Sequence, residues 1–195
     1  MPNRFSRILA ACLFLLTIMS VHAMAQVDTP KVELGVHFSY LRFRGFGEND
    51  TGFGGRLTFN LTENIAIEGD YTHFSGPFFF DTSRSREQVL VGVKTGIRSE
   101  SAGMFFKLRP GVMKFNGTTI PGPCLPAGSL ACTLAAGTNQ FAFDIGGVFE
   151  LYPIKKVVFR FDIGNTLIRF GGPYTDGPGF TSSNFQAKVG IGVRF

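Results

Sequence analysis

The chain is poor in charge and contains no tryptophan. Charged side chains make up 17% of its 195 residues, whereas an average globular protein has about 25%. Low charge together with 23 phenylalanines excludes a disordered chain, and the 25 glycines follow no Gly-X-Y repeat, which excludes a collagen-like chain. After the N-terminal segment the sequence also lacks a run of about 20 apolar residues, so a helical membrane span is excluded.

The N-terminus has the pattern of a secretory signal peptide over residues 1–25. Arg4 and Arg7 supply positive charge, residues 8–21 form an apolar stretch, and Ala23-Met24-Ala25 is an A-x-A cleavage site. The apolar stretch is too short for a spanning anchor. We therefore expect export, cleavage before residue 26, and a single domain over residues 26–195.

Cleavage changes the charge balance and the cysteine count. The signal carries two arginines and no acid, so 17 basic and 14 acidic residues remain, and nucleic acid is not an expected partner. Cys12 is lost, while Cys124 and Cys132 remain in an exported chain and predict a disulfide. Such a bridge would stabilise its loop by about 2.5 kcal/mol in the chain-entropy model. No further cysteine or clustered histidine accompanies this pair, so no metal site is expected.

Apolar and polar side chains alternate along the rest of the chain. In the first such segment Leu34, Val36 and Phe38 alternate with Gly35 and His37. Alternation with period two predicts half-buried strands. The eight predicted strands are residues 31–43, 53–61, 64–74, 88–98, 104–115, 139–152, 157–170 and 185–195.

The predicted connections alternate between short and long. Short ones fall near residues 62–64, 99–103 and 153–156, and long ones near 44–52, 75–87, 116–138 and 171–184. Short turns at one rim and long loops at the other are typical of a bacterial outer-membrane barrel. The strand lengths also match the 9–11 residues that a tilted transmembrane strand needs.

The composition of the two strand faces predicts their orientation. The apolar faces are bulky and aromatic, whereas the opposite faces mix charges with glycines, which suits a narrow interior and predicts apolar side chains toward lipid. The alternative is a soluble, lipocalin-like periplasmic barrel that binds an apolar ligand. That barrel would turn Leu34 and Val36 inward and Arg56 outward.

Successive strand residues point to opposite faces, and this alternation assigns 14 charged residues to the interior. Glycines on the same face would make room for their long side chains. An eight-stranded barrel is just wide enough for side chains to fill, and buried ions must be paired. A structural network is therefore favoured over a proton or ion path. This lumen charge network comprises Glu33, Arg56, Glu68, Asp70, Lys94, Arg98, Lys107, Arg109, Asp144, Glu150, Arg160, Asp162, Lys188 and Arg194.

The outward aromatic residues fall near the two rims. Aromatic girdles at both interfaces are typical of outer-membrane barrels. The set near the long loops is Tyr40, Phe53, Tyr71, Phe141 and Phe185, and the set near the short turns is Phe106 and Phe195.

Several segments resemble the small bacterial outer-membrane β-barrel family of the OmpA and OmpX type. They are GGRLTFN at 54–60, FFKLRPGVMKF at 105–115, FDIGGVFELYP at 143–153 and FRFDIG at 159–164. The terminal KVGIGVRF is similar to the signal by which the barrel-assembly machinery recognises its clients. The resemblance implies that Phe195 is part of that signal.

One set of residues suggests a different function. His73, Ser75 and Glu87 have a spacing similar to the triad of outer-membrane lipid A deacylases, in which histidine activates the serine. The residue after the serine is Gly76, where that family has asparagine. A lipid A-modifying hydrolase is therefore the alternative function.

Together these observations predict an all-β, eight-stranded antiparallel up-and-down transmembrane β-barrel in the bacterial outer membrane. We expect a monomeric, non-enzymatic protein with a structural, envelope-integrity or surface-binding role, a plugged lumen and four extracellular loops. Its expected partners are outer-membrane lipid, lipopolysaccharide and, during biogenesis, the barrel-assembly machinery. No cofactor is expected.

Overall fold

The computed structural model describes residues 30–44, 49–75, 85–116, 119–121, 133–135, 138–170 and 180–195. The predicted signal peptide, Cys124 and Cys132 lie outside these residues. The strands are β1 (Val32–Arg42), β2 (Asn49–Asn60), β3 (Ile65–Phe74), β4 (Arg86–Arg98), β5 (Ala102–Phe115), β6 (Thr119–Pro121), β7 (Thr133–Ala135), β8 (Thr138–Ile154), β9 (Val157–Phe170) and β10 (Phe180–Arg194). None of the described residues belongs to a helix long and apolar enough to cross a membrane.

Eight of these strands form a closed barrel in which every neighbouring pair is antiparallel. The order around the barrel is β1-β10-β9-β8-β5-β4-β3-β2, and β6 pairs with β7 as a separate ribbon. Pairing of Glu33 with Arg194 belongs to the β1–β10 ladder that closes the barrel. The predicted eight-stranded up-and-down barrel is confirmed.

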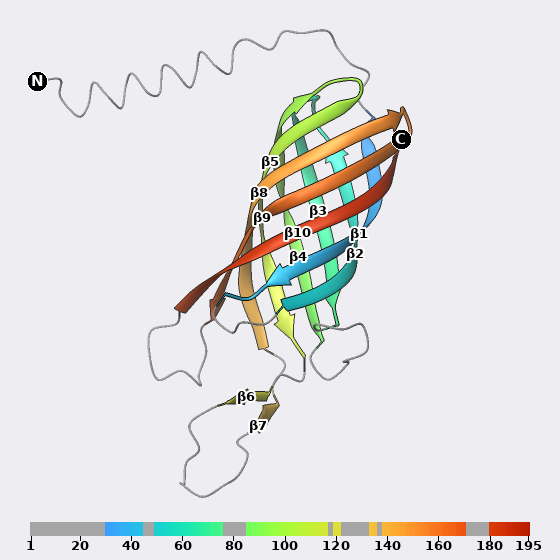
Figure 1. Ribbon diagram of the computed structural model, residues 1–195. Helices are drawn as coiled ribbons and strands as arrows, with labels where there is room; N and C mark the ends of the chain where they lie inside the picture. Colours follow the sequence, from blue (N-terminus) through green and yellow to red (C-terminus); the bar gives the residue numbers. More distant parts are fainter. Residues whose placement is uncertain are drawn as a thin grey trace, which may run out of the picture.

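The two rims differ in the length of their connections. Between consecutive barrel strands, residues 61–64, 99–101 and 155–156 form the short turns, whereas residues 43–48, 75–85, 116–137 and 171–179 form the long connections. Figure 1 shows the C-terminus at one end of the barrel and the β6–β7 ribbon beyond the other. We call these the turn end and the loop end.

Five strand starts lie earlier in the sequence than predicted, those of β5 and β8 by two residues and one residue. β2 begins at Asn49, β4 at Arg86 and β10 at Phe180, whereas alternation predicted starts at 53, 88 and 185. The residues added to β2 and β10 are mostly small or polar, so they show little apolar alternation. Pairing with β1 and β9 nevertheless extends these strands, since Asn49 pairs with Arg42 and Phe180 with Phe170.

The apolar faces point outward and the polar faces point inward. Leu34 and Val36 are 47% and 64% exposed, whereas Arg56 is 4% exposed. The lipocalin-like alternative required the opposite orientation and is therefore wrong. The outward face carries most of the exposed large apolar side chains, from Leu34 on β1 to Val193 on β10.

Most inward glycines have a different cause from the one expected, whereas at Gly35 the Arg56 guanidinium group does lie 3.0 Å from a Cβ position. A Cβ atom on Gly92 would lie 2.0 Å from the carbonyl oxygen of Leu108, and one on Gly111 would lie 2.0 Å from that of Val89. The backbone of the neighbouring strand, rather than a long Arg or Lys side chain, therefore excludes a side chain at these positions. Glycine in a strand commonly marks such a close approach of another backbone.

Candidate functional site: the charged lumen

The lumen charge network is buried inside the barrel. Its residues have at most 7% exposure, apart from the half-buried Arg98, whose side chain is 1% exposed. Each of the eight barrel strands contributes at least one member: Glu33 (β1), Arg56 (β2), Glu68 and Asp70 (β3), Lys94 and Arg98 (β4), Lys107 and Arg109 (β5), Asp144 and Glu150 (β8), Arg160 and Asp162 (β9), and Lys188 and Arg194 (β10). Strand parity thus places charges from distant parts of the sequence in one lumen.

Glu68 lies at the centre of the network and binds two arginines. Its Oε1 accepts hydrogen bonds from Arg109 Nη1 at 2.5 Å and from Arg160 Nη2 at 2.8 Å. Arg160 also donates to Asp162 at 3.0 and 3.1 Å, and Arg109 Nε donates to Asp144 at 2.9 Å. Each arginine therefore bridges at least two carboxylates, which compensates the burial of these five charges.

Asp70 forms a second group with Lys188. Lys188 Nζ donates to Asp70 Oδ1 at 2.5 Å and to Thr72 Oγ1 at 3.1 Å. His37 Nε2 lies 3.0 Å from the same Thr72 oxygen, and His37 Nδ1 lies 3.8 Å from Asp70 Oδ2. The buried His37 ring is therefore held by Thr72 and lies close to the carboxylate of Asp70.

The turn end of the lumen combines ion pairs with aromatic rings. Glu33 accepts from Arg98 at 3.3 Å and lies 3.4 Å from Arg194 Nε. Both guanidinium groups also lie over the ring of Tyr152. The distance from Cζ to the ring centroid is 5.7 Å for Arg98 and 4.0 Å for Arg194. Tyr152 donates its hydroxyl to Glu150 at 2.7 Å. These contacts hold the aromatic ring across this end of the lumen.

The loop end contains an apolar cluster that the sequence interpretation did not identify. The cluster consists of Leu41, Phe43, Phe74, Leu90, Met113, Phe115, Ala142 and Ile168. Arg86 Cζ lies 4.7 Å from the ring centroid of Phe43 and 5.5 Å from that of Phe115. Arg86 also forms an ion pair with Asp50. Both members of this pair were missed because β2 and β4 were predicted to start too late.

Uncharged polar side chains lie between part of the cluster and the charges. Gln186 donates to Gln88 at 3.0 Å and to Ser39 at 3.1 Å. It also accepts a hydrogen bond from Thr166 at 2.5 Å. Apart from the Arg86–Asp50 pair, the lumen therefore changes from mainly apolar at the loop end to charged at the turn end.

The three residues of the hydrolase alternative lie at the loop end. His73 and Glu87 are register partners on β3 and β4, and Ser75 follows β3 directly. Glu87 also lies 3.8 Å from Lys114 Nζ. None of the described residues belongs to a group of His, Cys, Asp and Glu side chains placed to hold a metal ion.

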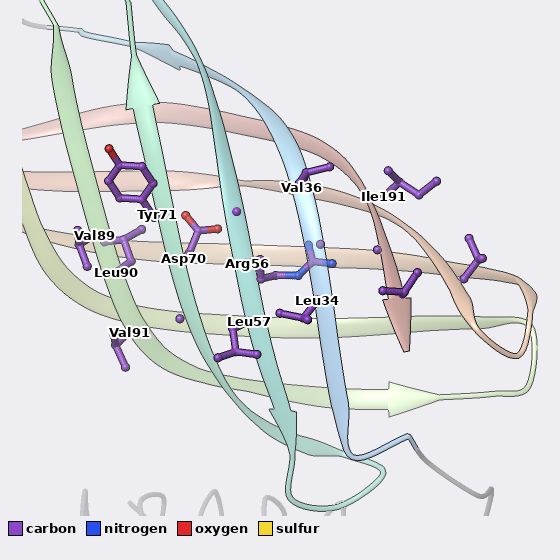
Figure 2. A pocket seen from close by; sticks show the side chains of 16 residues that line it. Leu34, Val36, Arg56, Leu57, Asp70, Tyr71, Val89, Leu90, Val91 and Ile191 are labelled. Atoms are coloured by element: carbon purple, nitrogen blue, oxygen red, sulfur yellow. The ribbon is translucent and has the colours of Figure 1, made fainter. Parts of the chain in front are cut away.

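An apolar hollow lies on the outer face of the barrel, mainly over β1–β4 and β10, and its lining includes the lumen residues Arg56 and Asp70 (Figure 2). It measures about 810 Å³ and surrounds Gly55 and Gly69. A Cβ atom on Gly69 would meet nothing within 4 Å, so these outward glycines leave a gap between Val36, Leu57 and Tyr71. Apart from Arg56 and Asp70, whose side chains are buried, the residues that line the hollow are glycines, aliphatic residues and Tyr71.

Comparisons with known proteins show the fold. No family model and no curated protein matches the sequence. The N-terminal β-barrel domain of Pseudomonas aeruginosa OprF is 12% identical, with a TM-score of 0.51 over 84% of this chain and 97% of that one. Neisserial surface protein A is 10% identical, with a TM-score of 0.53 over 84% of this chain and 96% of that one. The fold is therefore that of the small eight-stranded outer-membrane barrels.

Proposed function

We propose that this chain is an integral protein of the bacterial outer membrane, exported with a signal peptide that is cleaved after residue 25. The observation that carries the proposal is the distribution of side chains across the barrel wall. Charged residues such as Arg109 and Glu68 are buried inside, whereas Val91, Phe161 and Ile191 are 55%, 48% and 45% exposed outside. In water this arrangement would leave a continuous apolar surface, but in a bilayer it buries that surface in lipid.

The outward aromatic residues support the same placement. Phe53 and Phe141 are 57% and 54% exposed toward the loop end, and Phe106 and Phe195 are 45% and 68% exposed toward the turn end. Aromatic side chains at both boundaries of an apolar band are characteristic of transmembrane barrels. We assign the turn end to the periplasm and the long connections to the cell surface.

The proposed role is structural or surface-binding, with a lumen that conducts no ions. The apolar cluster around Phe43 occupies one end of the lumen, and Tyr152 with its two arginines occupies the other. Between them the charges, apart from Arg56, form ion pairs with one another. A monomer of this kind contributes to envelope integrity and presents four loops to lipopolysaccharide or to external surfaces.

Fractionation of cells that express the chain tests the proposal. We expect the protein in the outer-membrane fraction, with N-terminal sequence beginning at Gln26, and with different gel migration before and after boiling in detergent. Boiling unfolds a barrel that resists cold detergent, which produces the shift. Recovery as a soluble periplasmic protein would contradict the membrane placement.

Hydrolysis of an acyl ester in lipid A is a second candidate function. It is favoured by the register of β3 and β4, which sets His73 directly opposite Glu87 on the outward side of the sheet. Ser75 lies two residues farther along the chain and would be the nucleophile. Incubation with lipid A followed by mass spectrometry tests this function: it requires loss of one fatty acyl chain by the wild-type protein and none by the Ser75→Ala variant.

A further inference from the structure

Arg56 differs from the other buried cations of the barrel. Every other cation of the lumen charge network, and Arg86, has a carboxylate oxygen within 4.0 Å of a side-chain nitrogen. Arg56 is 4% exposed, yet among the described residues it forms no ion pair, and its Nε and Nη2 are buried without a hydrogen-bond partner. A buried charge without compensation is strongly unfavourable.

The carboxylate nearest in register is already occupied. Asp70 pairs with Arg56 in the β2–β3 ladder, but its two oxygens are engaged by Lys188 at 2.5 Å and Arg109 at 3.5 Å. Figure 2 shows the Arg56 side chain extending from β2 toward β1. Its Nη2 lies 3.0 Å from the position that a Cβ atom on Gly35 would occupy. The guanidinium group therefore lies against a strand position without a side chain.

The charge balance of the lumen agrees with this local picture. Among the described residues, nine cations and seven carboxylates have buried side chains, which leaves an excess of two positive charges. One excess charge lies at the turn end, where Arg98 and Arg194 share Glu33 and contact the ring of Tyr152. The other is Arg56.

We propose that Arg56 holds a small monovalent anion of the halide class, chloride under ordinary conditions, inside the lumen. An anion supplies the charge that the protein omits and accepts hydrogen bonds from both unpartnered nitrogens. The interior of an eight-stranded barrel is filled by side chains, which favours a monatomic ion over a larger organic anion. The side chain that would hold the anion is buried, although Arg56 also borders the outer hollow.

Crystals of the detergent-solubilised protein grown in bromide test the site directly. We expect an anomalous peak within hydrogen-bonding distance of Arg56 Nε and Nη2. Electron density beside Arg56 that a water molecule explains, with no anomalous signal, would overturn the proposal. It would mean that water alone forms the hydrogen bonds of the guanidinium group. This experiment uses the wild-type chain and does not depend on the folding of any variant.

Unfolding in urea at constant ionic strength gives a second test in solution. The wild-type midpoint should rise with chloride replacing gluconate and reach a plateau, as expected for a ligand that binds the folded state. Arg56→Gln should lose this dependence and unfold at the same midpoint in both salts. Lys114→Gln, which removes a positive charge from an exposed side chain, should keep it. Equal chloride dependence in Arg56→Gln and wild type would contradict the assignment.

Discussion

Arg160 and Glu68 meet at the centre of the barrel although 92 positions separate them in the sequence, with Arg160 Nη2 donating to Glu68 Oε1 at 2.8 Å. Their strands, β9 and β3, lie on opposite sides of the closed sheet. The pair therefore spans the lumen and links two walls that share no backbone hydrogen bonds. Arg109 on β5 reaches the same carboxylate from a third direction.

Removal of the central carboxylate should destabilise the barrel strongly. Glu68→Gln leaves Arg109 and Arg160 with less negative charge in a buried site, and loss of one partner from a buried ion pair costs about 3–5 kcal/mol. Equilibrium unfolding in urea, followed by gel mobility, measures this loss. Glu87→Gln removes a half-exposed carboxylate and should change the free energy of unfolding by less than about 0.5 kcal/mol. Equal effects of the two substitutions would contradict the central role of Glu68.

A charge on the outer face should be costly in a bilayer. Val91 lies near the middle of β4 and is 55% exposed. Val91→Lys should lower the free energy of unfolding from liposomes by about 2–4 kcal/mol, the cost of lysine at the bilayer midplane. Val91→Leu keeps the face apolar and serves as the control. A Val91→Lys protein with unchanged stability and improved solubility without detergent would argue against a lipid-facing β4.

Planar-bilayer recording should detect no stable current through the wild-type barrel. The apolar cluster around Phe43 and the Tyr152 group occupy opposite ends of the lumen. The Tyr152→Ala variant should also show no stable current, because the apolar cluster still fills the loop end. A large steady conductance of the wild-type protein would refute the plugged lumen.

The predicted bridge between Cys124 and Cys132 is accessible to a thiol assay. Purified protein that has been exported should show no free thiol before reduction and two after it, because export places the chain in an oxidising compartment. The Cys124→Ser, Cys132→Ser double variant is the control for the assay background. Two free thiols in the untreated protein would exclude the disulfide.

Much of the fold could be predicted because alternation is a local property of the chain. Leu34 and Val36 are outward and His37 is inward for the same reason: successive strand residues point to opposite faces. The number of barrel strands and the alternation of short and long connections follow from the same pattern. Where alternation is weak, as between Phe180 and Asn184, the strand start was missed.

The sequence by itself determined which side chains of each predicted strand share a face, because alternation along a strand needs no information about its neighbours. Tertiary structure alone decided which of them meet. Closure of the sheet sets β3 opposite β9, so Glu68 pairs with Arg160, while Lys188 and Arg109 occupy Asp70 and leave Arg56 unpaired. The partners of a buried charge depend on the tilt and register of strands far apart in the chain, and no local pattern encodes those distances.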